Sequence, residues 1–407
     1  LYAWDGTKYA FETDTFPTGY LGTKNATGGW RKPNPYEYHL LDSTPQLLDG
    51  YYNLKIVEER NETDYFDTLK LYTVDYPLDR DIYQELRTAG IYVEPAQMIH
   101  TVDNILKRPL SITHVNTGEN ASAKLAYSDK DYLILNTDKN IDFNWQTLEI
   151  DLGDQSLAPQ IKLIIDAETV VPTTSAGKAR KNQLAPNGKI ARLEVLDANG
   201  NWTLVPYNVK EVFSPKERSN AYIVDITNIF TTGTYKFRLS FLYKVYVDAI
   251  FFDTTLDVPV TVTELPLVSA TLGYYGFSQK TEGEIFDYIY GNIVSRDTAY
   301  FTGKYTKYGD VTPLLTQTDD KFVIFAGGEE LNVLFTADSQ PPAGKSRRYL
   351  VYANGYYKAT GNIDISHTVE LLPFAAMSNY PYDPAVESYP TDAEHEQYRS
   401  EYNTREK

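Results

Sequence analysis

Apolar and polar residues alternate with a period of two along much of this chain. In the run FRLSFLYKVYVDAIFF, every second residue from Phe237 to Val247 is apolar or aromatic. A period of two places these side chains on one face of a β-strand. The same run carries Arg238, Lys244 and Asp248, and no apolar stretch of the sequence reaches the length of a membrane span. The pattern therefore predicts half-buried strands and not a membrane helix.

The first residues, LYAWDGTKYAFETD, give the same signal for a hairpin. Asp5-Gly6 is a turn signal between two short strand patterns. The aromatic positions of these patterns are Tyr2, Trp4, Tyr9 and Phe11. No Met, basic segment or apolar signal segment precedes Trp4. We therefore expect a mature or trimmed product and not a native translation start.

Polar, turn-rich segments divide the strand patterns into three blocks. The boundaries fall near HVNTGENASAK and before VPVTVTEL, which gives predicted domains at 1–110, 111–258 and 259–407. Within the second block, Asn199-Gly200 separates two apolar runs and predicts a tight hairpin. Short strands with turns at regular spacing favour a mainly β fold of β-sandwich, jelly-roll-like domains.

One short helix is predicted near the end of the chain. In TDAEHEQYRSEYN, Thr391 is followed three residues later by Glu394, which is the spacing of a capping box. Tyr398 and Tyr402 lie four residues apart, so they would share a helix face that docks on the body of the protein. The basic stretch PTTSAGKARKNQLAPNGK is punctuated by Pro and Gly and is predicted to be a loop.

Composition narrows the chemistry and the partners. The 407 residues include 35 Tyr and no Cys, which excludes disulfides, thiolate metal sites and Cys nucleophiles within the chain. A formal net charge of -17 argues against a nucleic-acid partner, because phosphates are bound through Lys and Arg. Asn-x-Ser/Thr sequons favour an exported, glycosylated protein. They begin at Asn25, Asn61, Asn120 and Asn201.

An acidic segment separates the strand patterns Tyr52–Val57 and Leu69–Val74. Its carboxyl residues are Glu58, Glu59, Glu62, Asp64 and Asp67. Glycosidases use two carboxylates that face each other across the substrate, and closeness in sequence does not supply that geometry. We therefore predict a solvated polar bend and assign no catalytic residue. A hydrolase with carboxylates from different blocks stays open as an alternative.

A weak calcium candidate lies at the predicted hairpin turn. Asp197, Asn199 and Asn201 alternate like the ligands of a calcium loop. A calcium ion binds roughly six to eight oxygens, and the bidentate Glu that ends an EF-hand loop is missing here. A plain Asn-Gly turn is the favoured interpretation, so no cofactor is predicted.

Other familiar motifs are missing from the sequence. The histidines lack the spacing of a zinc site, and FAGGEEL lacks the Lys of a phosphate loop. Gly327-Gly328 in that stretch is predicted to be a strand-to-strand turn. A second class of function stays open, because Trp145 and Trp202 in the second block are candidate platforms for stacking sugars.

Several stretches resemble, in order, a conserved C-terminal region of large exported bacterial and archaeal proteins. Those proteins carry FG-GAP/VCBS propeller repeats, ASPIC/UnbV (CRTAC-like) segments or tetratricopeptide repeats. LYAWDG is similar to the end of the Cys-Pro-aromatic-Leu-x-x-Trp-Asp-Gly stretch that opens this region. The segment YYNLKIVEERNETDYFDTLKLYTVDYP matches at Glu62, Tyr65, Asp67, Val74, Asp75 and Pro77. Later matches are WQTLEIDLGD, YTKYGDVTPLL, DDKFVIFAGGEELNVLF, LLPFAAMSNYPY and YPTDAEHEQYRSEYNTR.

The resemblance implies the C-terminal part of a longer exported polypeptide, with no established catalytic residues to carry over. VDYP departs from the pattern, because His is frequent where this chain has Tyr76. We predict a non-enzymatic structural or interaction module that is extracellular, on the cell surface or periplasmic. Its partners would be other protein segments or subunits of a larger assembly, or glycans, with no membrane insertion.

Overall fold

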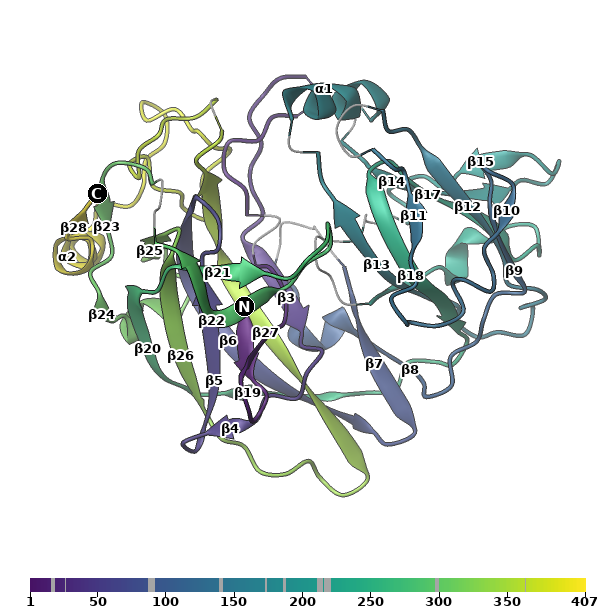
Figure 1. The fold of residues 1–407 in the computed structure, drawn as a ribbon, viewed down its shortest axis with the longest axis horizontal. Coiled ribbons are helices and arrows are strands. Elements are labelled where there is room, and N and C mark those ends of the chain that lie inside the picture. The colour runs from purple at the N-terminus through teal and green to yellow at the C-terminus, as the bar shows by residue number, and fades with distance from the viewer. Residues whose placement is uncertain are drawn as a thin grey trace.

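The computed structural model describes residues 1–15, 19–25, 27–86, 92–138, 142–172, 174–185, 188–210, 215, 221–296, 300–362 and 364–407. The fold is mainly β, as the alternating pattern predicts. Two pairs of sheets stack into two sandwiches that lie side by side, on the left and right of Figure 1. Among the described residues, no helix has the length and apolar character needed to cross a membrane.

The first sandwich is built from two antiparallel sheets. One contains β2 (Tyr9–Phe11), β1 (Tyr2–Trp4), β5 (Tyr51–Val57), β26 (Glu329–Thr336), β20 (Leu267–Tyr274) and β24 (Gly309–Asp310), with β4 (Leu47–Leu48) beside β5. The other contains β19 (Thr261–Leu265), β6 (Glu62–Pro77), β27 (Lys345–Ala359) and β3 (Tyr36–Leu40), with β25 (Val323–Ala326) beside β6. Alternate apolar residues of both sheets, such as Leu54, Leu71 and Val333, form the core between them.

The second sandwich has the same layered design. One sheet contains β10 (Glu119–Asn120), β9 (Ser111–His114), β12 (Gln146–Asp151), β17 (Lys236–Phe241), β14 (Ala191–Leu196) and β15 (Trp202–Leu204). The other contains β11 (Leu133–Leu135), β18 (Lys244–Asp253), β13 (Lys162–Val170), β16 (Tyr222–Asp225), β7 (Arg80–Glu85) and β8 (Ile99–Asp103). The alternating residues of the predicted Phe237–Val247 run lie in β17 and β18, and Phe237, Leu239 and Val247 enter the core.

Smaller elements complete the fold. They are the pairs β21 (Phe277–Lys280) with β22 (Tyr288–Ser295) and β23 (Lys304–Tyr305) with β28 (Arg405–Glu406), the helices α1 (Ser175–Leu184) and α2 (Ala393–Tyr402), and the 3-10 turns Pro95–Met98, Thr227–Ile229 and Thr312–Leu315. The hairpin predicted at Asp5-Gly6 joins β1 to β2, and Gly327-Gly328 is the turn between β25 and β26. A Cβ on Gly327 would lie 2.3 Å from the carbonyl oxygen of Arg60, which explains the glycine.

The sheets follow a different division from the predicted domains 1–110, 111–258 and 259–407. Strands β6 and β27, from the first and third of these segments, pair along most of their length, with Tyr72 opposite Leu350. Strand β7 of the first segment pairs in parallel with β16 of the second. Local patterns predict strands but not their partners, so pairings between distant segments were beyond the sequence analysis.

Two local predictions need correction. The acidic segment is not a solvated bend, because β6 begins at Glu62 and the side chains of Glu58, Asp64 and Asp67 are buried. The basic stretch predicted to be a loop contains α1, whose N-cap Thr174 accepts a hydrogen bond from the N–H of Gly177 at 3.1 Å. Good helix formers between the cap and Ala185 outweigh the flanking Pro and Gly residues.

The predicted C-terminal helix is confirmed as α2. Its N-cap is Asp392, one residue after the predicted Thr391, and the carboxylate accepts hydrogen bonds from the N–H groups of Glu394 and His395. The buried Tyr398 donates its hydroxyl proton to the carbonyl oxygen of Phe322 at 2.7 Å. Tyr402 packs against the core of the first sandwich, as its spacing from Tyr398 predicts.

The outer edge of β8 is closed by charged side chains in place of another strand. Lys162 is fully buried, and its ammonium group donates to the carbonyl oxygen of Thr101 and lies 3.2 Å from Asp253 and 3.1 Å from Asp257. Asp257 accepts from the N–H of Thr101 at 2.9 Å, and Asp253 accepts from the N–H of Asp103 at 3.2 Å. These contacts satisfy backbone groups that an edge strand otherwise leaves unpaired.

The edge of β3 is closed in a similar way by Gln84 of β7. The Gln84 amide accepts from the N–H of Leu40 at 2.7 Å and donates to the carbonyl oxygen of Tyr38 at 2.6 Å. Because β3 belongs to the first sandwich and β7 to the second, this amide joins them. Apolar residues of both, including Tyr72, Ile82 and Ile99, pack together beside it.

We expect Lys162→Met to lower the free energy of unfolding by about 3–5 kcal/mol, because the variant leaves the buried carboxylate of Asp253 without its cation. The measurement is denaturant unfolding followed by tryptophan fluorescence. Lys236→Met is the matched control, since Lys236 is partly exposed and pairs with Asp151 at 3.3 Å. Its loss should cost at most about 1 kcal/mol. Equal costs for the two variants would show that the Lys162 contacts do not secure the edge of β8.

Candidate functional site

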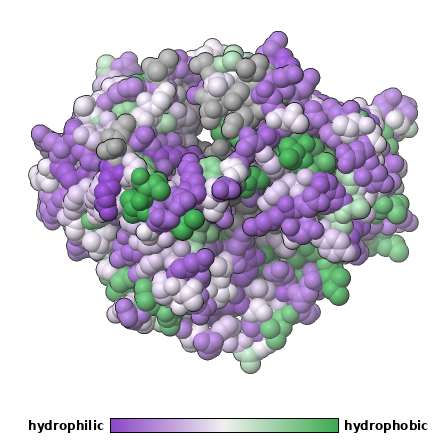
Figure 2. Space-filling model, in the orientation of Figure 1, coloured by the Kyte–Doolittle hydropathy of each residue, from purple (hydrophilic) through white to green (hydrophobic). Residues whose placement is uncertain are grey.

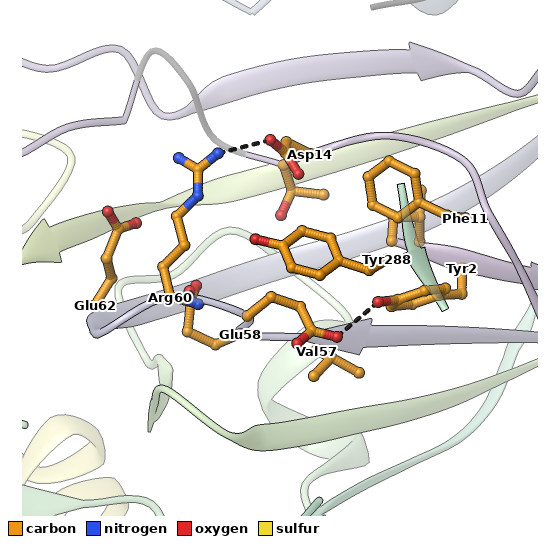
Figure 3. A pocket seen from close by; sticks show the side chains of 11 residues that line it. Tyr2, Phe11, Asp14, Val57, Glu58, Arg60, Glu62 and Tyr288 are labelled. Carbon is orange, nitrogen blue, oxygen red and sulfur yellow. Dashed lines mark hydrogen bonds and ion pairs between the residues drawn. The ribbon is translucent and has the colours of Figure 1, made fainter. Parts of the chain in front are cut away.

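A pocket lies where β5 leads into β6, at the segment that carries the acidic run (Figure 3). Its lining residues are Leu1, Tyr2, Phe11, Asp14, Thr15, Val57, Glu58, Glu59, Arg60, Glu62 and Tyr288. Strand pairing of β1 with β5 brings Tyr2 to this pocket, and Tyr288 enters from β22. The acidic residues are therefore gathered by the sheet and by the hairpin that covers it.

Fixed hydrogen bonds hold most of the polar groups of the pocket. The hydroxyl of Tyr2 donates to Glu59 at 2.6 Å, and the same carboxylate accepts from the N–H of Ser278 at 2.7 Å. Arg60 pairs with Asp14 at 2.9 Å across the pocket, as the dashed line in Figure 3 marks. Glu59, Asp14 and Arg60 therefore already have partners within the protein.

Glu58, which lines this pocket, forms a hydrogen-bonded pair of carboxyl groups with the buried Asp64. Burial is the main cause that raises the pKa of both groups, and it brings the pKa of Asp64 to about 7. The proximity of Asp64 raises the pKa of Glu58 further, because two carboxylates repel each other. A pair of this kind holds a proton at neutral pH, which the sequence did not indicate.

The pocket is too small for the paired-carboxylate catalysis that the acidic run suggested. Its cavity volume is about 50 Å³, which is space for a few water molecules. Small-molecule sites are commonly several hundred Å³ in volume. The geometry therefore favours a structural role for Glu58 and Asp64, and it gives no support to a hydrolase at this place.

Asp67 belongs to the same acidic run but lies away from the pocket lining. Its carboxylate accepts hydrogen bonds from the N–H groups of Asp319 and Asp320 at 3.1 and 3.2 Å. Burial raises the pKa of Asp67 to about 8. Its carboxyl group therefore anchors the 319–320 turn.

A buried lysine and a partly buried histidine were missed by the sequence analysis. The ammonium group of Lys358 donates to the carbonyl oxygen of Thr368 at 3.0 Å and lies 5.0 Å from the ring centre of Tyr380, and burial lowers its pKa to about 7. Burial alone would lower the pKa of His100, but the hydrogen bond to Asp257 at 2.7 Å and the nearby carboxylate of Glu85 at 3.8 Å raise it to about 9. The alternating pattern gives no sign of such groups, because polar residues are expected on the exposed face.

The calcium candidate forms the turn between β14 and β15. Asp197 accepts hydrogen bonds from the N–H groups of Asn199 and Asn201, both at 2.8 Å, and Gly200 has φ of 79°. Its carboxylate therefore already has backbone partners. Within the described ranges, no group of three or more His, Asp or Glu side chains is placed to hold a metal ion.

The sugar-stacking and glycosylation candidates all lie at the surface. Trp145 and Trp202 are half-buried, and neither lies inside the sandwich core. Each indole has an arginine over its ring, Arg192 at 4.5 Å from Trp145 and Arg238 at 4.2 Å from Trp202. The sequon asparagines are exposed, and they are Asn25, Asn61, Asn120 and Asn201.

Comparison with protein-family models, curated proteins and solved structures found no match. The resemblance to the C-terminal region of exported proteins therefore stays a prediction.

We expect Asp64→Asn to weaken the pH dependence of stability. The folded pKa of Asp64, about 7, lies above the unfolded value of roughly 4. The folded state therefore binds more protons in this range, and stability is lost as pH rises from 4 through 7. The variant should lose about 2 kcal/mol less unfolding free energy than the parent between pH 5 and pH 8.

The measurement for this variant is denaturant unfolding at each pH. Asp131→Asn is the control, because the Asp131 side chain is 72% exposed. Its pH profile should follow that of the parent. If Asp64→Asn also follows the parent, the buried pair does not hold the proton.

Proposed function

We propose that this chain is an exported, non-enzymatic interaction module that works within a larger surface or periplasmic assembly. The resemblance supports the compartment and the larger assembly. The open outer edge of β19 is the observation that supports binding to another polypeptide. Partners would be segments or subunits that supply an additional strand.

Strand β19 pairs with β6 on one side only, from Thr261 opposite Asp75 to Leu265 opposite Leu71. Among the described residues, no backbone or side-chain group hydrogen-bonds to the other side of this strand. Thr261 and Thr263 are exposed. An open edge of this kind accepts an extended segment of another chain through main-chain hydrogen bonds.

The edge strands β3 and β8 differ from β19, and this difference supports a binding role for the edge of β19. Those two edges are closed by Gln84 and by the Lys162 group, whereas among the described residues no group hydrogen-bonds to the outer edge of β19. Pro259 and Pro266 flank β19 and limit the edge to a short length. A short, proline-bounded edge would admit one strand of a partner and resist open-ended aggregation.

The β21–β22 hairpin offers a second contact surface on the first sandwich. Ile289 is 42% exposed and Val294 is 63% exposed on β22. Figure 2 shows hydrophobic side chains gathered over this hairpin, with hydrophilic residues around them. Exposed apolar groups with a polar rim are typical of interaction surfaces.

Hydrogen exchange would test the proposal on the complex purified from the native source. We expect outward-facing amides of Thr261–Leu265 to exchange at least about tenfold more slowly in the complex than in the isolated chain, because strand pairing protects them. The amides of β8 are the internal control, since their partners lie within the chain. A monomer in the native extract, or unchanged exchange in β19, would contradict the proposal.

Carbohydrate binding is the second candidate function. The half-buried indoles of Trp145 and Trp202 lie beside arginines, and Arg238 is held by Glu149 at 2.9 and 3.1 Å. An indole provides an apolar face for a sugar ring, and fixed polar groups beside it provide partners for hydroxyl groups. This pattern supports a sugar-binding surface on the β12–β17 sheet.

A glycan-binding screen would test this candidate. We expect Trp202→Ala to weaken binding of a recognised glycan at least about tenfold, because aromatic stacking contributes about 1–1.5 kcal/mol or more. Trp30→Ala is the matched control, since Trp30 lies outside the second sandwich and has Lys24 at 4.4 Å from its ring. If no glycan binds the unaltered chain, the candidate fails.

A further inference from the structure

A basic segment stands out within this acidic chain. Residues 172–193 contain no Asp or Glu, whereas the chain as a whole has 55 acidic and 38 basic residues. The basic residues of the segment are Lys178, Arg180, Lys181, Lys189 and Arg192. The segment includes α1 and the start of β14, and α1 lies at the top of Figure 1, near the junction of the two halves.

The end of α1 is docked beside Trp145. The indole N–H of Trp145 donates to the carbonyl oxygen of Leu184 at 3.4 Å, and Arg180 donates to the carbonyl oxygen of Phe143 at 3.2 Å. Arg192 reaches the same indole from β14, with its guanidinium carbon 4.5 Å from the ring centre. Trp145 therefore contacts both the end of α1 and Arg192 of β14, while Arg180 of α1 binds the backbone two residues earlier, at Phe143.

Three cations of α1 have no carboxylate partner within the described ranges. In the part of the chain that the structure describes, Lys178, Arg180 and Lys181 form no ion pair with a carboxylate. Burial lowers the pKa of Lys181, and the charge of Arg31 lowers it further. Positive charge from a distant part of the sequence therefore adds to that of α1.

Arg192 also keeps hydrogen-bonding capacity. Its Nε atom is buried and has no hydrogen-bond acceptor among the residues that the structure describes. The neighbouring carboxylate of Glu194 lies 3.9 Å away, beyond hydrogen-bond distance. The guanidinium group thus lies over Trp145, and its Nε donor is not matched to an acceptor among the described residues.

We propose that a basic patch at α1 binds a short acidic oligosaccharide that carries uronate carboxylates. This α1 basic patch is formed by Arg31, Lys178, Arg180, Lys181, Arg192 and Trp145. Planar guanidinium groups pair with carboxylates in a bidentate manner. The exposed part of the half-buried indole, which already has Arg192 over its ring, adds apolar contact for a sugar ring. The proposal rests on the carbohydrate-binding candidate and names its ligand class and its position at Trp145.

Charge distribution favours this ligand over a long polyanion. A duplex DNA would extend beyond the patch onto a protein of net charge -17, where it would be repelled. A short oligosaccharide needs only the patch. Its binding should weaken as salt concentration rises, because charged groups on the surface are screened.

The test is isothermal titration calorimetry of the full chain with oligogalacturonate and with a neutral oligosaccharide of equal length. We expect oligogalacturonate to bind and the neutral sugar not to bind at low salt. Arg192→Gln and Lys178→Gln should each weaken binding about tenfold, as expected for the loss of a charge-assisted contact. Lys236→Gln is the matched control outside the patch, and its binding should equal that of the unaltered chain.

Thermal unfolding of each variant checks that its fold is retained, and the exposed Lys178 keeps the test valid if Arg192→Gln unfolds. No binding of oligogalacturonate, equal loss in Lys236→Gln, or tighter binding of duplex DNA would overturn the proposal. Binding of the neutral sugar that is abolished by Trp202→Ala would also overturn it, while leaving the carbohydrate-binding candidate in place.

Discussion

A strand at the edge of a sheet has backbone groups that need partners, and the buried ammonium of Lys162 meets that need at β8. With Asp253 and Asp257 it closes the edge, so the β7–β8 hairpin is fixed in the second sandwich. Strand β6 of the first sandwich runs into β7 after a two-residue turn. The position of one sandwich relative to the other therefore depends on β7 and β8 being held. Gln84 of β7 also connects the two sandwiches, because its side-chain amide hydrogen-bonds to the backbone of β3 in the first sandwich.

Other buried polar side chains serve the same structural purpose. Glu329 is fully buried, and its carboxylate pairs with Arg405 at 2.6 and 2.9 Å and with Lys407 at 2.6 Å. It also accepts a hydrogen bond from the N–H of Ala326, so it ties the end of the chain to the β25–β26 turn. Asp67 anchors another turn through two backbone N–H groups. Because such polar groups already bind one another or the backbone, the surface is where an external partner would find free groups.

Sequence reasoning succeeded where the information is local. The period of two in Phe237–Val247 predicts β17 and β18, the Asn199-Gly200 turn predicts the β14–β15 hairpin, and the Tyr398–Tyr402 spacing predicts how α2 docks. It failed where the deciding contact lies far away in sequence. The pairing of β6 with β27 joins segments that no local pattern relates. The acidic run looks solvated until Glu58 and Asp64 are seen to face each other inside the fold, because burial is a property of the packed sheets.

The β19 edge and the α1 helix belong to different sandwiches, and this separation bears on how the module would work. The open edge of β19 belongs to the first sandwich, whereas α1 follows β13 and precedes β14 in the second. A strand added to β19 would therefore not occupy the basic patch at Trp145. A protein partner and an acidic glycan would be able to bind at the same time. Their relative position would be set by the contacts of Lys162 and Gln84, which hold the two sandwiches together. Buried polar contacts would therefore determine how the two exposed binding surfaces are oriented relative to each other.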